Sequence, residues 1–208
     1  MEELRELEAV AVVCTICRLA ETRTQVVFGV GDPHTDLMFV GEAPGMNEDL
    51  QGEPFVGAAG QLLNRLLVEI GLSREDVYIA NVIKCRPPGN RDPLSDEIDS
   101  CKGYLRSQIS LIDPNVVVTL GNFATKLLLR TETGITRLRG RTYDWWQGRK
   151  LVPTFHPAAA LRSQQKLIPE MQKDFQVIRE ALAVPRSRPA PAVPERQVVE
   201  PAQMDLFS

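Results

Sequence analysis

Short apolar segments of strand length alternate with segments of helical periodicity along this chain, and this alternation constrains the fold more than any other feature. The predicted strands cover residues 36–40, 77–80, 115–120 and 151–155, and the main predicted helices cover residues 2–13, 57–70, 95–112, 123–130 and 166–184. The third strand is almost wholly apolar, as is typical of a parallel strand covered by helices on both faces. The pattern predicts a three-layer α/β/α sandwich around a short, mainly parallel four-stranded sheet.

Each predicted strand is followed by a residue with chemical or conformational potential. Because the carboxyl ends of parallel strands meet at one edge of a sheet, these residues should converge on one site. The first strand runs into the loop 41–45, whose outer glycines allow close backbone approach to a ligand. The residue before Pro157 is pushed into an extended conformation, so it should point off the strand end. The four residues are Glu42, Asn81, Gly121 and His156.

Length and composition fit one globular domain followed by a tail. The chain has 208 residues, of which 43% are hydrophobic and 25% charged, as in ordinary soluble proteins. From residue 185 the sequence is rich in Pro, Arg, Ser, Ala and Glu and cannot bury enough apolar surface to fold alone. We expect a folded domain over residues 1–184 and a disordered tail over residues 185–208. The acidic start and the lack of a membrane-length apolar run predict a cytoplasmic protein.

The net charge of -3 argues against nonspecific coating of nucleic acid, although local basic patches are compatible with an acidic body. Cations interleaved with aromatic rings suit a single strand or a distorted duplex, because cations meet phosphates while rings stack on bases. A solvated hairpin with a tryptophan edge buried in the core is the alternative. One such patch surrounds Trp145 and Trp146 and contains Arg137, Arg139, Arg141, Arg149 and Lys150, with Arg139 as our predicted DNA contact.

Four cysteines are candidates for a metal site. Cys14 and Cys17 form a C-x2-C pair, Cys85 lies in a proline-rich loop and Cys101 lies near a helix start. Disulfides are rare in the cytoplasm, and four thiolates suit either tetrahedral zinc or an iron-sulfur cluster. Four unrelated buried cysteines are the alternative, because only the first pair has ligand spacing. Spacing alone does not distinguish zinc from iron and sulfide.

In combination and in this order, the motifs resemble a family 4 uracil-DNA glycosylase, the thermostable, iron-sulfur type within that superfamily. The resemblance rests on the loop 41–45, Asn81, the segment 156–161 and the four cysteines, and it covers about residues 10–182. It implies an α/β/α fold and a 4Fe-4S cluster on the cysteines, with zinc as the less favoured occupant. It also implies hydrolysis of the N-glycosidic bond of uracil in single- or double-stranded DNA, which releases uracil and leaves an abasic site.

The resemblance implies roles for individual residues. Phe55 would stack on a uracil flipped out of the DNA. The amide of Asn81 would pair with uracil O4 and N3–H and would mispair with cytosine. His156 and the backbone N–H groups of the loop 41–45 would hold the developing uracil anion. The substrate-binding residues implied in this way are Gly41, Ala43, Gly45, Phe55 and Asn81.

At two positions the sequence departs from the best-known superfamily pattern. Ala43 stands where that pattern has the water-activating aspartate, and Gly45 stands where it has the thymine-blocking tyrosine. We therefore predict that Glu48 serves the attacking water, while Glu42 shapes the pocket and blocks the thymine methyl group. A helix-cap or surface carboxylate is the alternative interpretation of Glu48.

Two further segments are predicted to bind macromolecules. The loop after residue 156 resembles the superfamily's intercalating loop, with Leu161 as an apolar wedge and Arg162 on phosphate; otherwise it is the first turn of a surface helix. Residues 203–208 resemble the motif by which bacterial repair and replication proteins bind the sliding clamp. Its docking side chains would be Gln203, Leu206 and Phe207, unless this short match is accidental.

Two other functions compete with the glycosylase interpretation. The first is a protein that recognises uracil in DNA without turnover or by covalent attachment. Relatives that trap DNA covalently carry a histidine in an arginine-rich loop, and the corresponding loop 136–141 has none. The second is a noncatalytic accessory domain of a DNA polymerase, which would not need Asn81 and His156. No sequence feature indicates an oligomer, so we expect a monomer.

Overall fold

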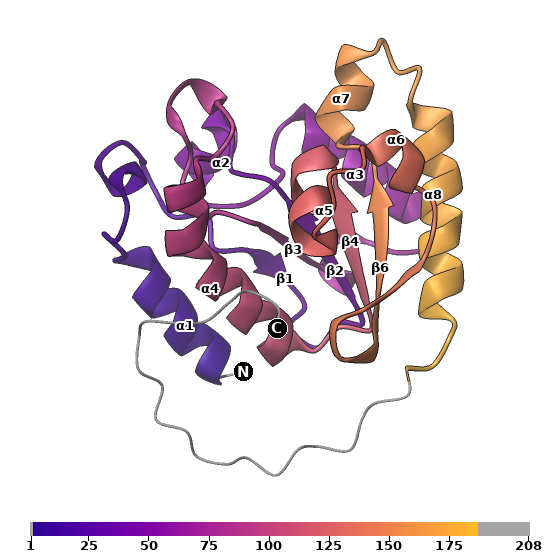
Figure 1. Ribbon diagram of the computed structural model, residues 1–208, viewed down its shortest axis with the longest axis horizontal. Helices are drawn as coiled ribbons and strands as arrows, with labels where there is room; N and C mark the ends of the chain where they lie inside the picture. The colour runs from indigo at the N-terminus through magenta and orange to yellow at the C-terminus, as the bar shows by residue number, and fades with distance from the viewer. Residues whose placement is uncertain (1, 187–208) are drawn as a thin grey trace.

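In the computed structural model, residues 2–186 are described, and they form a mixed six-stranded sheet between two layers of helices (Figure 1). The strand order is β1-β3-β2-β4-β6-β5, and the four inner strands are parallel to one another. The α/β/α class is therefore confirmed. The strands are β1 (Val30–Gly31), β2 (Leu37–Gly41), β3 (Tyr78–Asn81), β4 (Val116–Leu120), β5 (Tyr143–Trp145) and β6 (Arg149–Thr154).

The predicted four strands form the parallel centre of the sheet, but the predicted strand number was too small. β1 pairs with β3 and β5 pairs with β6, both antiparallel, at the two edges of the sheet. They have two and three residues and none of these is buried, so they leave no run of alternating or apolar residues in the sequence. β5 lies within the segment 131–148, which we expected to be irregular or a hairpin.

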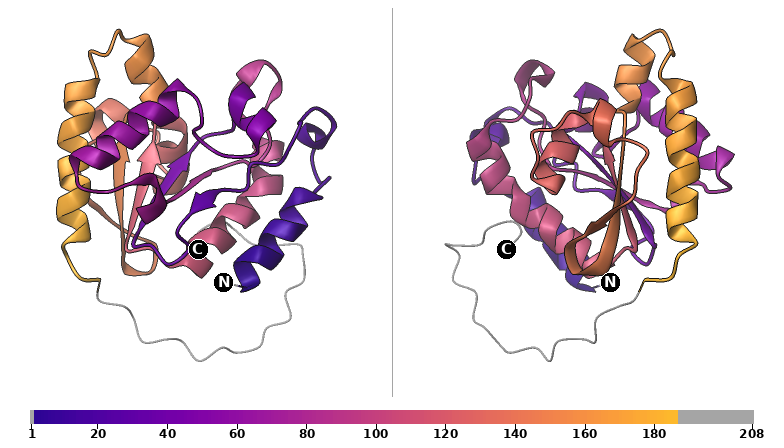
Figure 2. Two further views of the ribbon diagram at one scale, coloured as in Figure 1. Left: turned by 180° about the vertical axis from the view of Figure 1, so that it is seen from behind. Right: turned by 45° about the vertical axis from the view of Figure 1, so that its right-hand side comes forward.

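Helices cover both faces of the sheet (Figure 2). One face is covered by α3, α7 and α8, and the other by α4 and α5, with α1 packed on the outside of α4. The helices are α1 (Glu2–Val12), α2 (Met46–Gln51), α3 (Ala58–Glu69), α4 (Ser95–Ile112), α5 (Asn122–Leu129), α6 (Ile135–Leu138), α7 (Pro157–Arg162) and α8 (Ile168–Leu182). Short 3-10 turns cover Arg18–Glu21, Arg74–Asp76, Pro88–Asn90 and Trp146–Gly148.

The sequence of β2 is apolar at every position from 37 to 40, which explains why this strand is buried on both faces of the sheet. Leu37 and Phe39 belong to the core shared with α3 and α8, whereas Met38 and Val40 belong to the core shared with α4 and α5. All four are at most 2% exposed. A strand with water on one face would need polar residues at alternate positions, so this sequence specifies a central strand.

The described residues include the predicted end of the folded domain. α8 ends at Leu182, two residues before the expected boundary at residue 184. Most of the predicted tail and the whole predicted clamp-binding segment, residues 203–208, lie outside the described residues. None of the helices within residues 2–186 is long and apolar enough to cross a membrane.

Candidate active site and cysteine site

The carboxyl ends of the four parallel strands open into one cavity of about 1060 Å³. The convergence predicted from the sequence is confirmed, because all four of the strand-end residues line this cavity. The backbone of Gly121 has a φ of +93°, and a Cβ there would lie 2.9 Å from the Cβ of His156. Glycine therefore allows the end of β4 to approach the end of β6. These four strand-end residues are Glu42, Asn81, Gly121 and His156.

Gly41, the last residue of β2, lies against both Asn81 and Phe55. A Cβ at this position would be 2.3 Å from Asn81 Oδ1 and 2.8 Å from two carbons of the Phe55 ring. Phe55 itself has a φ of +54°, a strained conformation for a residue with a side chain. Arg74 fixes this conformation by donating hydrogen bonds to the carbonyl oxygens of Pro54 and Phe55. The absence of a side chain at Gly41 therefore lets the Asn81 amide and the Phe55 ring pack closely against the end of β2.

Asn81 presents an unsatisfied acceptor in this part of the cavity. The residue is 2% exposed, and its Oδ1 has no hydrogen-bond partner among the described residues. A buried acceptor without a partner costs about 1–3 kcal/mol, so such atoms are rare unless a ligand completes them. The geometry thus provides one amide oxygen ready to accept a hydrogen bond from a ligand N–H group.

His156 is held as a neutral imidazole with a defined tautomer. It is the N-cap of α7, and its Nδ1 accepts a hydrogen bond of 3.1 Å from the backbone N–H of Ala158. The remaining proton of a neutral ring must then be on Nε2. Burial, reinforced by the positive charge of Arg162, lowers the pKa of His156 to about 4, while Glu48 opposes this shift. At neutral pH the ring therefore offers an N–H donor without a full charge.

Two carboxyl groups line the same cavity. Glu48 Oε1 accepts hydrogen bonds from the backbone N–H groups of Val56 (3.1 Å) and Gly57 (3.3 Å), so the carboxylate also orders the loop before α3. The carboxyl of Glu42 has its pKa raised to about 7 by burial and by the nearby Asp92. At neutral pH Glu42 is thus close to half protonated, unlike an ordinary surface glutamate.

The predicted DNA-contacting residues of α7 lie at the rim of the cavity. Arg162 is exposed and lines the cavity, which leaves its guanidinium accessible. Leu161 is half-buried and packs against the core beneath α3 and α8. Both residues belong to the short helix Pro157–Arg162. The segment is therefore helical, as the alternative interpretation of a helical turn predicted.

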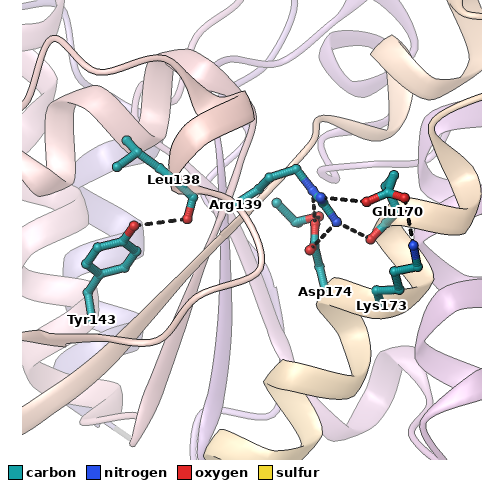
Figure 3. A network of polar contacts seen from close by, with 7 residues as sticks. Leu138, Arg139, Tyr143, Glu170, Lys173 and Asp174 are labelled. Atoms are coloured by element: carbon teal, nitrogen blue, oxygen red, sulfur yellow. Dashed lines mark hydrogen bonds and ion pairs between the residues drawn. The ribbon is translucent and has the colours of Figure 1, made fainter.

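Arg139 is directed into the domain, and we withdraw it as a DNA contact. Figure 3 shows its guanidinium between two carboxylates of α8. Its Nε donates to Asp174 Oδ2 over 2.9 Å, and its Nη1 donates to Glu170 Oε2 over 2.8 Å. The side chain is only 15% exposed. Four of its five N–H groups donate to Asp174 and Glu170, so this shielded guanidinium is not placed to bind a phosphate.

Within the aromatic and basic segment around residues 137–150, the two tryptophans and Arg149 follow the structural alternative, whereas Arg137 and Arg141 are exposed. Trp145 and Trp146 pack against the core beneath α4 and α5. Arg149 is 1% exposed, lies over the Trp146 ring at 4.8 Å and pairs with Asp113 at 2.7 Å. The sequence pattern was misleading because the spacing of arginines and tryptophans does not say which of them face inward.

All four cysteines line a second, small cavity between the end of α1, the loop after β3 and the start of α4. Among residues 2–186 no three His, Cys, Asp or Glu side chains are grouped so that they could hold one metal ion. Zinc requires four sulfurs at about 2.3 Å from a single ion. In a 4Fe-4S cluster each cysteine binds a different iron, so the sulfurs lie further apart. Four thiols around one cavity are a donor set compatible with zinc or with an iron-sulfur cluster.

Two N–H donors point at the cysteine sulfurs. Arg23 Nη1 donates to Cys85 Sγ over 3.4 Å, and the backbone N–H of Lys84 donates to Cys101 Sγ over 3.2 Å. Hydrogen bonds of this kind stabilise thiolates and tune bound clusters. Without metal, burial raises the pKa of the Cys101 thiol to about 12, so binding iron must displace its proton.

Three residues of these sites were not identified from the sequence. Asp92 lines the main cavity beside Glu42, Arg74 fixes the backbone at Phe55, and Lys84 lies buried beside the cysteines. The position of Asp92 in the proline-rich loop after Cys85 was an available signal. No periodic pattern in the sequence indicates that Lys84 is buried in an apolar core. The same holds for Arg74, whose partners are carbonyl groups of a separate loop.

Comparison with known proteins shows the family of this chain. A family model described as "Uracil DNA glycosylase superfamily" matches residues 28–183. A protein of Sulfurisphaera tokodaii named "Type-4 uracil-DNA glycosylase" is 45% identical over 194 residues, covering 89% of this chain and 88% of that protein. Proteins of the same name from Archaeoglobus fulgidus (46% over 187 residues, 86% and 94% covered) and Thermotoga maritima (48% over 165 residues, 78% and 86% covered) are also similar.

Proposed function

The chain belongs to the uracil DNA glycosylase superfamily, and we propose from its site that it is a monofunctional uracil-DNA glycosylase of the type-4 kind. It hydrolyses the N-glycosidic bond of uracil in DNA, releases uracil and leaves an abasic site for base-excision repair. The observation that carries the proposal is the buried amide of Asn81, whose Oδ1 has no partner within residues 2–186 and which lines the same cavity as the Phe55 ring.

Uracil complements this amide, whereas cytosine does not. Asn81 Oδ1 accepts the uracil N3–H, and the Asn81 NH2 group donates to uracil O4. Cytosine has an unprotonated N3 and an amino group at C4, so both hydrogen bonds would face a group of the same kind. Glu42, at the end of β2, shapes the pocket and excludes the C5 methyl group of thymine.

The base reaches the site only after it leaves the DNA stack. Phe55 offers an aromatic face for the flipped uracil, and the strained backbone that carries it is fixed by Arg74. Leu161 occupies the gap in the duplex, with Arg162 on a phosphate. The accessible guanidinium of Arg162 at the cavity rim supports this orientation, and the half-burial of Leu161 requires the tip of its side chain to make the contact.

The leaving group is stabilised without a positive charge. As the N-glycosidic bond breaks, negative charge accumulates on uracil, and the Nε2–H of neutral His156 donates to its O2. The backbone N–H groups of Ala43 and Gly45 supply further donors from the loop after β2. A donor that is already neutral and oriented needs no proton transfer or reorganisation during the reaction.

Glu48 is the proposed partner of the attacking water. Its Oε1 is fixed by two backbone N–H groups, so its carboxylate is oriented within the cavity before DNA binds. An ionised carboxylate there steadies the cationic sugar and accepts a proton from water. The same hydrogen bonds give Glu48 a structural role, and this combination allows one substitution to separate the two roles.

We propose that Cys14, Cys17, Cys85 and Cys101 hold a 4Fe-4S cluster. The common cavity and the N–H donors to two sulfurs support this assignment. The cluster supplies crosslinks between three segments that are distant in sequence, and no step of base excision is assigned to it. Iron and acid-labile sulfide analysis should find about four of each per chain; stoichiometric zinc would contradict the assignment.

Three further proposals concern the setting of the enzyme. Residues 203–208 dock on a bacterial sliding clamp through Gln203, Leu206 and Phe207, and deletion of this segment should abolish clamp pull-down while sparing excision on a short oligonucleotide. The protein acts as a monomer. We place it in the cytoplasm, where reducing conditions keep cysteines available for a cluster.

The proposed function is tested by excision from an oligonucleotide with a single uracil, scored by alkaline cleavage. Thymine and cytosine oligonucleotides and an Asn81→Ala variant serve as controls. We expect multiple-turnover cleavage confined to uracil and loss of at least 100-fold, on the order of removing one preorganised contact to the reacting base, in the variant. Binding without cleavage would contradict the proposal and favour a recognition protein.

A further inference from the structure

Lys84 is a buried cation whose described partners are all uncharged. It is 1% exposed, and its ammonium donates to the Asn81 carbonyl oxygen over 2.9 Å and to Gln108 Oε1 over 2.5 Å. The ammonium also lies 5.8 Å from the centre of the Phe28 ring. Among the ion pairs of residues 2–186, none includes Lys84.

A charge in this position requires a compensating charge. A buried ammonium is costly unless an anion lies close to it, and two amide oxygens and a ring face compensate only part of that cost. Groups that can become anionic line the same small cavity as Lys84, among them the thiols of Cys85 and Cys101. The backbone N–H of Lys84 already donates to Cys101 Sγ. Four thiolates on a cluster would supply the missing negative charge.

The same side chain contacts the backbone of Asn81. Asn81 ends β3, and Cys85 follows it by four residues, so Lys84 lies between the proposed base-reading amide and a proposed cluster ligand. The hydrogen bond from its ammonium group to the Asn81 carbonyl oxygen joins the two ends of the segment 81–84. Gln108 supports the arrangement from α4 by donating to the carbonyl oxygen of Phe28 over 2.9 Å.

We infer that Lys84 is the internal counter-cation of the cysteine-bound cluster, and that its bond to the Asn81 carbonyl positions the uracil-reading end of β3. This inference rests on the proposed cluster and on the proposed role of Asn81. Lys84 is a positioning residue, because it touches neither the base nor the sugar in this arrangement.

Two measurable consequences follow. Removal of the Lys84 charge leaves the cluster more negative, which disfavours adding an electron, so its reduction potential becomes more negative. Removal of the ammonium also frees the Asn81 carbonyl, so uracil should be held less well. Since Asn81 contacts uracil both before and during bond cleavage, KM should rise about tenfold with a smaller change in kcat.

The experiment compares holoenzymes of wild type and Lys84→Met by redox titration followed by electron paramagnetic resonance, with steady-state kinetics beside it. Lys84→Arg keeps the charge and should keep the wild-type potential. Lys102→Met is the matched control, because Lys102 follows Cys101 directly but pairs with Asp99 at the helix surface. We expect a shift to more negative potential in Lys84→Met and a much smaller one in Lys102→Met.

A second variant covers the case in which Lys84→Met does not fold. Gln108→Glu leaves Lys84 and all cysteines in place but puts a carboxylate against the ammonium. It should also shift the potential to a more negative value, because it offsets the same charge from the opposite side.

The outcomes separate this inference from the function on which it rests. A loaded Lys84→Met enzyme with the wild-type potential would overturn the counter-cation role, and an unchanged KM would overturn the link to Asn81. A wild-type protein purified without iron would overturn both the proposed cofactor and this inference. A shifted potential in a protein without glycosylase activity would support the counter-cation role and contradict only the proposed function.

Discussion

Replacing Gly41 by alanine tests the shape of the proposed uracil site with a single methyl group. The added Cβ would lie 2.3 Å from Asn81 Oδ1 and 2.8 Å from two Phe55 ring carbons, closer than nonbonded atoms approach. Both neighbours are buried, so neither can move into solvent to relieve the overlap. The amide and the ring must therefore shift from their positions, which displaces two of the proposed contacts to the base.

The expected size of the effect follows from the cost of overpacking. An extra methyl group in a well-packed site costs about 1–3 kcal/mol. Applied to binding of the reacting base, this corresponds to a loss in kcat/KM of about five- to 150-fold. If the same strain is released on unfolding, Tm falls by about 2–12 °C. The variant should therefore remain folded at assay temperature, and steady-state excision of uracil from a short oligonucleotide measures the effect.

Gly103→Ala is the matched control for this substitution. Gly103 lies within α4, and a Cβ there would meet nothing within 4 Å. Because alanine is the better helix former, this variant should gain about 0.5–1 kcal/mol in stability and keep full activity. Wild-type kcat/KM in Gly41→Ala would refute the assignment of Asn81 and Phe55 to the uracil site.

Further predictions address the carboxylates and the cysteines. Glu48→Gln keeps an acceptor for Val56 and Gly57 but removes the charge, so kcat should fall by about 10²–10⁴-fold with little change in Tm; an unchanged excision rate would leave Glu48 a purely structural role. Because Asp92 helps to raise the pKa of Glu42 to about 7, Asp92→Asn should move any transition near pH 7 in the pH profile of kcat/KM to lower pH, and an unmoved transition would exclude this coupling. The Glu42 carboxyl keeps its proton up to about pH 7 in the native protein but loses it near pH 4.5 in the unfolded chain, so its contribution to the free energy of unfolding decreases as the pH rises between these values. This decrease should be less steep in Asp92→Asn, and urea unfolding at several pH values would measure it. Cys85→Ser should lose the visible absorbance of the cluster together with thermal stability, and a variant that kept both would contradict the four-cysteine assignment.

The parallel core and the converging strand ends could be predicted because their signals are local. β2 and β4 are almost wholly apolar, Asn81 ends β3 and His156 lies two residues after β6, so one topological rule brings them together. The two edge strands could not be predicted, because they have two and three residues and are held by pairing with β3 and β6.

The direction of long side chains was the main limit of sequence reasoning. Arg139 resembled a DNA contact in its sequence context, yet it pairs with Asp174 and Glu170, which are 35 and 31 residues away in the chain. Lys84 is buried for a related reason, since its partner Gln108 lies on α4, 24 residues away in the chain. Partners so distant in sequence become visible only once the helices are placed on the sheet.

A crystal structure of the protein with uracil bound would test the central claim most directly. The account predicts the base between Asn81 and Phe55, with N3–H donated to Asn81 Oδ1, O4 near the Asn81 NH2 group and O2 within hydrogen-bond distance of His156 Nε2. It also predicts that Gly41 makes van der Waals contact with the ring. Uracil bound elsewhere in the cavity, or with Asn81 Oδ1 still unpaired, would contradict the account.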